Sequence, residues 1–345
     1  MRTTTGWRAA GPNHVEHTVI KRRDLRPDDV AVRVDYCGVC HSDLQAMRGH
    51  VGPGPLVPGH EFTGVVRDTG AEVSSLRIGD RVAVGNIVDS CGECAMCAIG
   101  QENFCHDFPT LTYGGTDRHD SSTTLGAYSR EYVVREAFAY RLPDGLDPAS
   151  AAPLMCAGVT VWEPLRALDV GPSSRVAVVG FGGLGHLAVK FAAALGAATT
   201  VISRTEDKRE DAHRLGAHDF IVSADSEQMR AARESFDVVI DTVSAPHDLS
   251  YYLGLVALDG TLEVLGYLGE VTLPVTDLLL GRKKLGAAGS GGRGATAEML
   301  RFCADSGVVP EVEVLPSSQA DIALDRLDRN DVRYRFVLDL SDLGE

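Results

Sequence analysis

The chain lacks a long uninterrupted hydrophobic run and has few basic side chains. Its most apolar stretch, residues 175–198, contains Lys190, His186 and several glycines, so we do not expect it to cross a membrane. Lys and Arg number 33 against 48 Asp and Glu, which gives a formal net charge of −15. Because an acidic protein repels phosphodiester backbones and anionic lipids, nucleic-acid and membrane-surface roles are disfavoured.

The first residues also lack the apolar segment of a secretory signal peptide, so we expect a reducing, cytoplasmic location. In that environment the eight cysteines are expected to serve metal binding or catalysis rather than disulfides. The 345 residues are 44% hydrophobic, which excludes disorder and predicts about two domains, each with its own core.

Four of the eight cysteines lie in a window of 15 residues with the spacing CxxCxxCx7C. They are Cys91, Cys94, Cys97 and Cys105. The spacing predicts a tetrahedral structural Zn²⁺ site with no open position for chemistry. Four unrelated buried thiols are the alternative, but so short and polar a loop offers them no core. An iron–sulfur cluster is disfavoured because there is no second run and no Pro after the last Cys.

The pattern of apolar residues divides the chain into two textures. Up to about residue 143 it reads as short strands and turns, with strands at 30–36, 64–66, 81–84 and 131–134. From about residue 149, buried strands alternate with helices. Strands are predicted at 175–179, 199–203, 219–222, 236–243, 261–266 and 285–289, and helices at 184–195 and 208–215. This alternation predicts a parallel sheet covered on both faces.

The last 50 or so residues return to strands, at 311–315 and 334–338, and are expected to rejoin the first domain.

A glycine-rich turn of the form GxGxxG lies between the strand at 175–179 and the helix that follows. In that context Gly180 makes the tight turn, Gly182 lets the backbone approach a diphosphate, and Gly185 permits close helix–strand packing. An ordinary strand–helix turn is the alternative. The residues assigned to the dinucleotide turn are Gly180, Gly182, Gly183, Leu184 and Gly185.

The end of the next strand carries Ser203 and Arg204 where an NAD site usually has an acidic residue. A neutral Ser removes the repulsion of a 2′-phosphate, and Arg204 with Lys208 can donate charge-assisted hydrogen bonds to it. NADP(H) is therefore preferred over NAD(H). The alternative for Lys208 is a solvated cation among neighbouring acidic side chains.

Several motifs together resemble the zinc-dependent medium-chain alcohol dehydrogenases, and most closely their cinnamyl alcohol dehydrogenase branch. They are CGVCHSD at 37–43, PGHE at 58–61, the four-cysteine run, PLMCAGVT at 153–160 and the glycine turn. The resemblance implies an α/β fold with a GroES-like β-rich catalytic domain, residues 1–149 and 290–345, that holds both zinc sites. Residues 150–289 would form a Rossmann domain with a doubly wound parallel sheet.

The resemblance also implies the residues of a catalytic zinc site. It assigns the ligands to Cys40, His60 and Cys156, with Glu61 as a conditional ligand. Three protein ligands leave a fourth position where Zn²⁺ can polarise a substrate oxygen as a Lewis acid. Asp43 would orient His60, and the Ser42 hydroxyl would begin a proton relay. Each subunit would bind two zinc ions, one catalytic and one structural.

Further cofactor contacts are implied at His41, Thr160, Thr242, Val243 and Ser244. Three departures from the family pattern leave the substrate open. Gln45 stands where many relatives carry a second relay His, residues 49–57 are mostly Gly and Pro, and the loops 114–120 and 289–294 are unusual.

The resemblance predicts an NADP-dependent aldehyde reductase that acts on an aldehyde/primary alcohol pair. It also suggests a homodimer formed through strands near Thr261–Thr272. The closest alternative is a reductase of iminium groups or activated alkenes in specialised metabolism. A zinc-ribbon-like nucleic-acid-binding protein is less consistent, because the four-cysteine loop carries acidic side chains and no Lys or Arg.

Overall fold

The computed structural model describes residues 1–50 and 54–344, so part of the glycine- and proline-rich segment 49–57 lies outside the described residues. The chain divides into two compact units: Met1–Cys156 with Gly291–Glu345, and Ala157–Ser290. The sequence analysis placed the first boundary after residue 149. The structure places it after Cys156, because α3 (Pro148–Ala151) and a short 3₁₀ helix (Ala152–Met155) pack against strands of the first unit.

The first unit is built on a seven-stranded sheet in the order β16-β17-β3-β4-β5-β9, with β8 also paired to β3. Its strands are β3 (Asp29–Val39), β4 (Phe62–Thr69), β5 (Arg81–Val84), β8 (Glu131–Arg135), β9 (Ala139–Arg141), β16 (Val312–Pro316) and β17 (Arg335–Asp339). Val30, Val32 and Val34 of the central β3 are fully buried, so this strand anchors the core. Because β17 pairs with β3, the C-terminal segment rejoins the first unit, as predicted.

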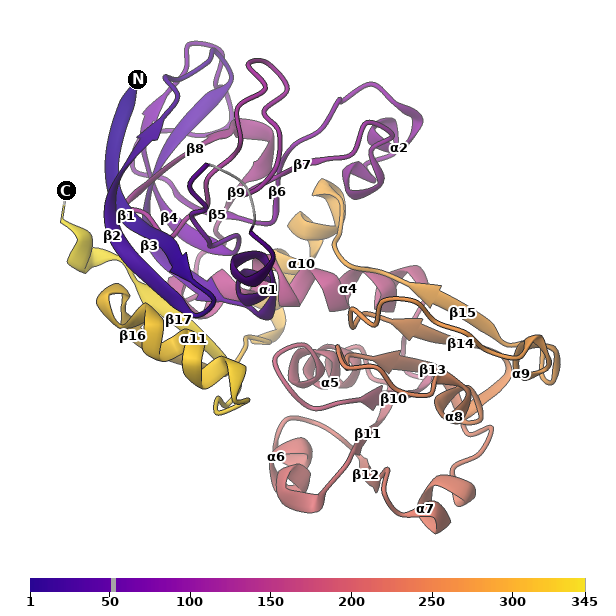
Figure 1. Cartoon of the computed structure of the whole chain (residues 1–345). Helices are drawn as coiled ribbons and strands as arrows, with labels where there is room; N and C mark the ends of the chain where they lie inside the picture. The colour runs from indigo at the N-terminus through magenta and orange to yellow at the C-terminus, as the bar shows by residue number, and fades with distance from the viewer. Residues whose placement is uncertain (51–53, 345) are drawn as a thin grey trace. The chain divides into compact units, whose positions relative to one another are not determined.

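Two separate antiparallel pairs also belong to this unit. They are β1 (Arg2–Gly11) with β2 (His14–Arg22), and β6 (Ile87–Asp89) with β7 (Thr110–Leu111). Figure 1 shows the first pair as long indigo strands and places α2 (Ala95–Ala98) on a loop that projects from this unit.

The sequence pattern predicts short strands and turns up to about residue 143 and strands over the last 50 or so residues, and it gives no sign of this unit's helices. The unit also contains α1 (His41–Gly49), α10 (Arg293–Ser306) and α11 (Ala320–Asp328). In α10, Met299, Leu300 and Cys303 are buried at helical spacing, a weak periodic signal that follows a glycine-rich segment.

The second unit is a six-stranded parallel sheet in the order β12-β11-β10-β13-β14-β15 (Figure 1). The strands are β10 (Arg175–Val179), β11 (Ala198–Ser203), β12 (Asp219–Val222), β13 (Phe236–Asp241), β14 (Val256–Val264) and β15 (Lys284–Ala287). The helices are α4 (Ala157–Ala167), α5 (Gly185–Ala194), α6 (Arg209–Arg214), α7 (Ser226–Ala231), α8 (Leu249–Leu253) and α9 (Val275–Leu279). This strand order is that of a dinucleotide-binding doubly wound sheet, as predicted.

Both faces of the second sheet are buried. Ala177 and Val179 of β10 join a cluster that includes Met229 of α7 and Leu253 of α8. The alternate residues of β10 are also fully buried, and α5 packs against β10 and β11. In such a sheet, ligands bind at the carboxyl ends of the strands where the order reverses, which here lies between β10 and β13.

Over residues 1–50 and 54–344, none of the helices combines the length and apolar character that a membrane span requires.

Candidate active site and metal centres

Three potential metal ligands from separate segments of the first unit converge. Cys40 caps the N-terminus of α1, His60 precedes β4, and Cys156 ends the chain's first passage through the unit. The ligand atoms of these residues all lie within 4.8 Å of one another. The structure therefore brings together the three residues that the sequence analysis assigned to one metal ion.

Asp43 fixes the orientation of this group. Its fully buried carboxylate accepts hydrogen bonds from the backbone N–H of Cys40 at 3.0 Å and of Gly59 at 3.1 Å. The same carboxylate lies 3.1 Å from Nδ1 of His60, whose Nε2 lies 3.2 Å from Sγ of Cys156. A carboxylate at Nδ1 holds the proton there and leaves the Nε2 lone pair for a metal ion.

The surroundings also control the charge on the three donors. The hydrogen bond from Cys156 lowers the pKa of the Cys40 thiol well below its usual value, and the same contact raises the pKa of Cys156. Burial lowers the pKa of His60, but the charge and hydrogen bond of Asp43 together with those of Cys40 outweigh burial and raise the pKa well above its usual value. Because thiolates bind zinc, a thiol whose pKa is lowered beside a second thiol suits a site for a cation.

Glu61, the predicted conditional ligand, lies outside the group of mutually close donors. It forms a buried ion pair with Arg335, and its other oxygen, Oε2, has no hydrogen-bond partner in the described part of the chain. Burial raises the pKa of Glu61 to about 8. The pair packs closely on the CGVC segment, because a Cβ at Gly38 would lie 2.5 Å from the Glu61 carboxylate.

The predicted relay residues lie at the start of α1. The Cys40 thiol approaches the exposed Ser42 hydroxyl at 3.6 Å, and His41 and Gln45 are also exposed. The Ser42 hydroxyl is therefore close to the metal donors and open to solvent.

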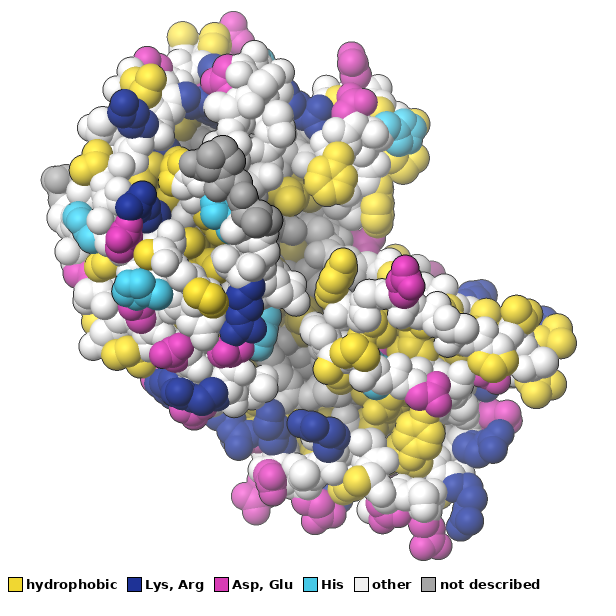
Figure 2. Space-filling view, viewed as in Figure 1, with side chains coloured by type: hydrophobic (Ala, Val, Ile, Leu, Met, Phe, Trp, Pro, Cys, Tyr) yellow, Lys and Arg dark blue, Asp and Glu magenta, His cyan; other side chains and the backbone are white. Residues whose placement is uncertain are grey.

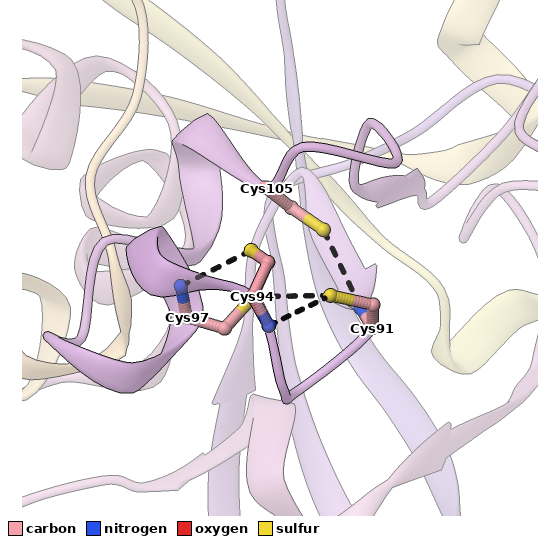
Figure 3. A group of neighbouring side chains, drawn as sticks. All are labelled: Cys91, Cys94, Cys97 and Cys105. Atoms are coloured by element: carbon pink, nitrogen blue, oxygen red, sulfur yellow. Dashed lines mark hydrogen bonds between the residues drawn. The ribbon is translucent and has the colours of Figure 1, made fainter.

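The four cysteines of the sequence motif form a second cluster, in which all four sulfur atoms lie within 4.8 Å of one another (Figure 3). All four are free thiols. We call residues 91–105 the cysteine loop. It carries α2 and a 3₁₀ helix (Glu102–Phe104).

Backbone N–H groups point at the sulfur atoms of the cysteine loop. The N–H of Cys94 donates to Cys91 at 3.4 Å, and the N–H of Cys97 donates to Cys94 at 3.5 Å. The latter bond lowers the pKa of the Cys94 thiol to about 6, whereas burial raises the pKa of Cys97 to about 11. Four sulfur donors with amide support match the chemistry of a tetrahedral zinc site.

In the second unit, the glycine turn follows β10 as the sequence predicts. Gly180 has φ +83°, a conformation that favours glycine, and a Cβ at Gly185 would lie 2.1 Å from the Gly180 carbonyl oxygen. A Cβ at Gly182 would meet nothing within 4 Å, so the backbone is open there. Leu184 caps α5 without a side-chain hydrogen bond, which leaves the helix N-terminus available to an anion.

Lys208 and Thr242, two of the residues assigned to the adenosine end, contact this turn. Lys208 Nζ donates to the Phe181 carbonyl oxygen at 2.8 Å, while Ser203 and Arg204 lie at the end of β11, where Arg204 is exposed. The Thr242 hydroxyl donates to the Val179 carbonyl oxygen at 2.9 Å, directly beneath the turn. Val243 and Ser244 continue from Thr242.

Thr160 of α4 is assigned to the nicotinamide end. Its hydroxyl donates to the Gly289 carbonyl oxygen at 3.0 Å.

Two regions of the chain match known domains. Residues 26–144 match the alcohol dehydrogenase GroES-like domain, and residues 183–305 match the zinc-binding dehydrogenase family. The chain belongs to the zinc-dependent medium-chain alcohol dehydrogenases.

Individual similar proteins indicate the branch of the family to which this dehydrogenase belongs. It is 45% identical over 331 residues to a probable formaldehyde dehydrogenase of Bacillus subtilis, with 95% of each chain covered. It is 45% identical over 329 residues to an NADP-dependent alcohol dehydrogenase of Mycobacterium bovis, covering 94% of this chain and 95% of the relative. The structure of a cinnamyl alcohol dehydrogenase from Sorghum bicolor matches with a TM-score of 0.95, 41% identity and all of both chains. The resemblance to the cinnamyl alcohol dehydrogenase branch is confirmed.

The structure of this dehydrogenase also reveals residues that the sequence analysis missed. Arg335 is one. Tyr113 is another, since its ring packs edge-on against His60 with centroids 5.5 Å apart. In the second unit, His247 Nε2 lies 2.7 Å from the buried Asp241 carboxylate and Nδ1 lies 2.8 Å from the Ala245 carbonyl oxygen. Only their contacts in the fold identify them, because none belongs to a spaced motif.

Proposed function

We propose that this chain is an NADP(H)-dependent aldehyde reductase that interconverts an aldehyde and a primary alcohol. The observation that carries the proposal is the convergence of Cys40, His60 and Cys156 on one point. Three donors are one fewer than a tetrahedral zinc ion takes, so a substrate oxygen can complete the set.

Each residue of the site has a proposed task. Cys40, His60 and Cys156 would hold the catalytic zinc ion, and Asp43 would keep His60 in the binding tautomer. When bound, zinc supplies Lewis acidity to the substrate oxygen, and the nicotinamide supplies or accepts hydride. Ser42 would move a proton between that oxygen and solvent. Because Ser42 is itself exposed, the proton can leave through water, although Gln45 cannot carry it.

Glu61 is suited to act as an occasional zinc ligand. Its unpartnered Oε2 is a buried acceptor next to His60 in sequence, and the Arg335 charge balances the other oxygen. We propose that Glu61 tunes the charge of the site and binds zinc only when another ligand leaves.

The cofactor is proposed to be NADP(H). The glycine turn and the open N-terminus of α5 suit a diphosphate, and Ser203, Arg204 and Lys208 suit a 2′-phosphate. The Mycobacterium bovis relative is described as NADP-dependent. His41 and Thr160 would contact the diphosphate and nicotinamide, with Thr242, Val243 and Ser244 toward the adenosine.

The cysteine loop is proposed to hold a structural zinc ion through Cys91, Cys94, Cys97 and Cys105. Its four thiols complete a tetrahedral shell without any outside ligand, so it would stabilise the loop and take no part in turnover.

A homodimer is proposed through the edge of the second sheet. β15 is the edge strand of that sheet, and hydrophobic side chains gather over α9 and β15 on the face shown in Figure 2. The exposed apolar side chains of this region include Leu258, Tyr267, Val275, Leu279 and Leu280. A sheet edge beside an apolar patch is suited to pairing with a second copy.

We also propose a cytoplasmic location for the protein.

The test is NADPH oxidation measured over aliphatic, aromatic and bulky aldehydes, with iminium compounds and activated alkenes in parallel. We expect turnover of at least one aldehyde class and no faster turnover of the other acceptors. Faster reduction of an iminium or alkene would instead favour the alternative activity.

Ser203→Asp combined with Arg204→Ile should shift kcat/KM toward NADH by about tenfold or more. Unchanged values for both cofactors would show that another site reads the phosphate.

A further inference from the structure

The loop between β13 and α8 contains an acid–histidine pair that the proposed mechanism does not use. Asp241 is the last residue of β13 and is fully buried, and His247 lies six residues later with its side chain 17% exposed. The residues proposed to contact the adenosine, 242–244, lie between them. We call residues 242–248 the cofactor loop. It starts at the carboxyl end of β13, the end of such a sheet at which a dinucleotide binds.

The pair joins the two ends of the cofactor loop. The Asp241 carboxylate accepts the N–H of Val243 at 3.0 Å and lies 2.7 Å from Nε2 of His247. Nδ1 of the same ring lies 2.8 Å from the carbonyl oxygen of Ala245. One imidazole ring therefore bridges the end of β13 and the middle of the loop, and it fixes the path of the backbone between them.

The cofactor loop is also joined to the glycine turn. The Thr242 hydroxyl lies 2.9 Å from the carbonyl oxygen of Val179 and 3.2 Å from that of Gly180. A Cβ at Gly266 would lie 2.0 Å from the carbonyl oxygen of Val243, so the loop rests directly on the segment after β14. Because the loop has so little free space, a change in its path is expected to move the residues assigned to the cofactor.

The contacts of the ring decide how many protons the pair holds. A carbonyl oxygen only accepts hydrogen bonds, so Nδ1 of His247 carries a proton. A second proton lies between Nε2 and the Asp241 carboxylate, on either atom, because two bare acceptors 2.7 Å apart repel each other. The pair thus holds two protons and no net charge. Burial raises the pKa of Asp241, which favours this form. Loss of one proton leaves a buried negative charge and forces one of the two ring contacts to break.

The groups around His247 leave this titration to the pair. On α8, the ring of Tyr252 packs edge-on against His247 with centroids 5.4 Å apart, and burial raises the pKa of its hydroxyl. Tyr252 in turn packs against Tyr251 and lies within reach of the Arg204 charge. The carboxylate of the adjacent Asp248 caps α8. Tyr252 therefore stays neutral over the pH range in which histidine loses its proton.

We propose that His247 is a positioning residue for NADP(H), and that the two-proton form of its pair with Asp241 holds the cofactor loop in its binding conformation. The inference rests on the proposed contacts of residues 242–244 with the cofactor. As the pH rises, the pair loses a proton, one contact of the ring breaks, and a negative charge appears near a polyanionic cofactor. NADPH binding is therefore strong below the titration of the pair and weaker above it.

The test is the dissociation constant of NADPH for the zinc-loaded enzyme, measured by cofactor fluorescence from roughly pH 6 to pH 9. We expect the wild-type affinity to fall by about tenfold over this range, because a hydrogen bond between charged groups is lost. His247→Gln keeps a donor for Asp241 but cannot titrate, so its affinity should change much less with pH. NADH is titrated in parallel, because ionisation of the 2′-phosphate affects NADPH alone whereas His247 acts on both cofactors.

His213→Gln is the matched control. Nδ1 of His213 also lies near a carbonyl oxygen of the second unit, that of Ala217 at 3.0 Å, but His213 is exposed and pairs with no carboxylate among the described residues. This variant should keep the wild-type pH profile. The proposal is overturned if His247→Gln has the wild-type profile with both cofactors, or if the wild-type affinity does not change with pH. Absence of NADPH binding at every pH would instead contradict the proposed cofactor, and this inference with it.

Discussion

The two metal-ligand clusters of the first unit differ in how the chain assembles them. The four thiols of the cysteine loop come from 15 consecutive residues, and their sulfur atoms accept hydrogen bonds from amides of the same loop. The three donors of the other cluster span residues 40–156 and depend on β3, β4 and the 3₁₀ helix before Cys156 for their positions. A local cluster can form with its loop, whereas the assembled cluster requires the whole unit to fold.

The clusters also differ in what surrounds them. The buried Asp43 carboxylate and the Glu61–Arg335 pair lie behind Cys40 and His60. At the cysteine loop, backbone N–H groups face the sulfur atoms instead, and Cys91 and Cys94 are half-exposed, as is Cys156 of the assembled cluster. Buried charge of this kind is typical of groups that take part in chemistry, whereas backbone amides at sulfur atoms stabilise thiolates. This difference supports the proposal that the first cluster is catalytic and the second structural.

Loss of Cys156 is the largest expected effect. Cys156→Ala should remove about one zinc ion per chain and lower kcat by at least about 10³-fold, because two donors cannot hold a catalytic ion. Metal content by emission spectrometry and NADPH-linked turnover measure both. Cys303→Ala is the matched control, since Cys303 is buried in α10 and belongs to neither cluster, and it should retain both ions. Full activity in Cys156→Ala would contradict the assignment.

Loss of Cys97 should act on stability instead. Cys97→Ala is expected to remove the other zinc ion and to lower the free energy of unfolding by about 3 kcal/mol, because metal binding adds to folding energy. For protein that stays folded, kcat should stay within about threefold of the original. Denaturant unfolding and turnover at low temperature separate the two effects. A loss of kcat as large as that of Cys156→Ala would remove the distinction between the clusters.

The difference between local and long-range contacts also explains which parts of the fold the sequence predicts. β5, β10 and β12 begin and end where the apolar runs predict, because these strands are continuous buried segments. The hairpin of β1 and β2 was missed. In β1 only Gly6 is buried, so the strand has no apolar face for a pattern to reveal.

The metal-ligand clusters, too, are predictable from the sequence only where their residues are close together in the chain. The spacing of the four cysteines predicts their convergence, because a short loop limits where each thiol can point. Cys40, His60 and Cys156 could be joined only through a family resemblance. Arg335 lies 274 residues from its partner Glu61, and no local pattern connects them.

Asp43→Asn tests the buried charge behind the assembled cluster. The amide keeps the shape but loses the charge that holds the proton at Nδ1 of His60, so zinc affinity or activity should fall by about 10–100-fold. Chelator competition measures the affinity, with Asp68→Asn as the control, because Asp68 is a more exposed carboxylate on β4 of the same unit. Wild-type zinc affinity and turnover would show that backbone contacts alone orient the ring.

Glu102→Gln is expected to have the smallest effect. It tests whether the cysteine loop also stabilises a part of the chain outside residues 91–105. Glu102 is buried between the last two cysteines, and its carboxylate accepts the N–H of Arg293 at 2.8 Å, the first residue of α10. A carboxylate at a helix N-terminus is stabilising, so the variant should lose about 1 kcal/mol of unfolding free energy. Zinc content and kcat should not change, because the hydrogen bond and the ion pair of the Glu102 carboxylate in the described part of the chain go to Arg293 and not to a metal donor. A loss of zinc together with stability would show instead that α10 and the cysteine loop fold as one metal-dependent element.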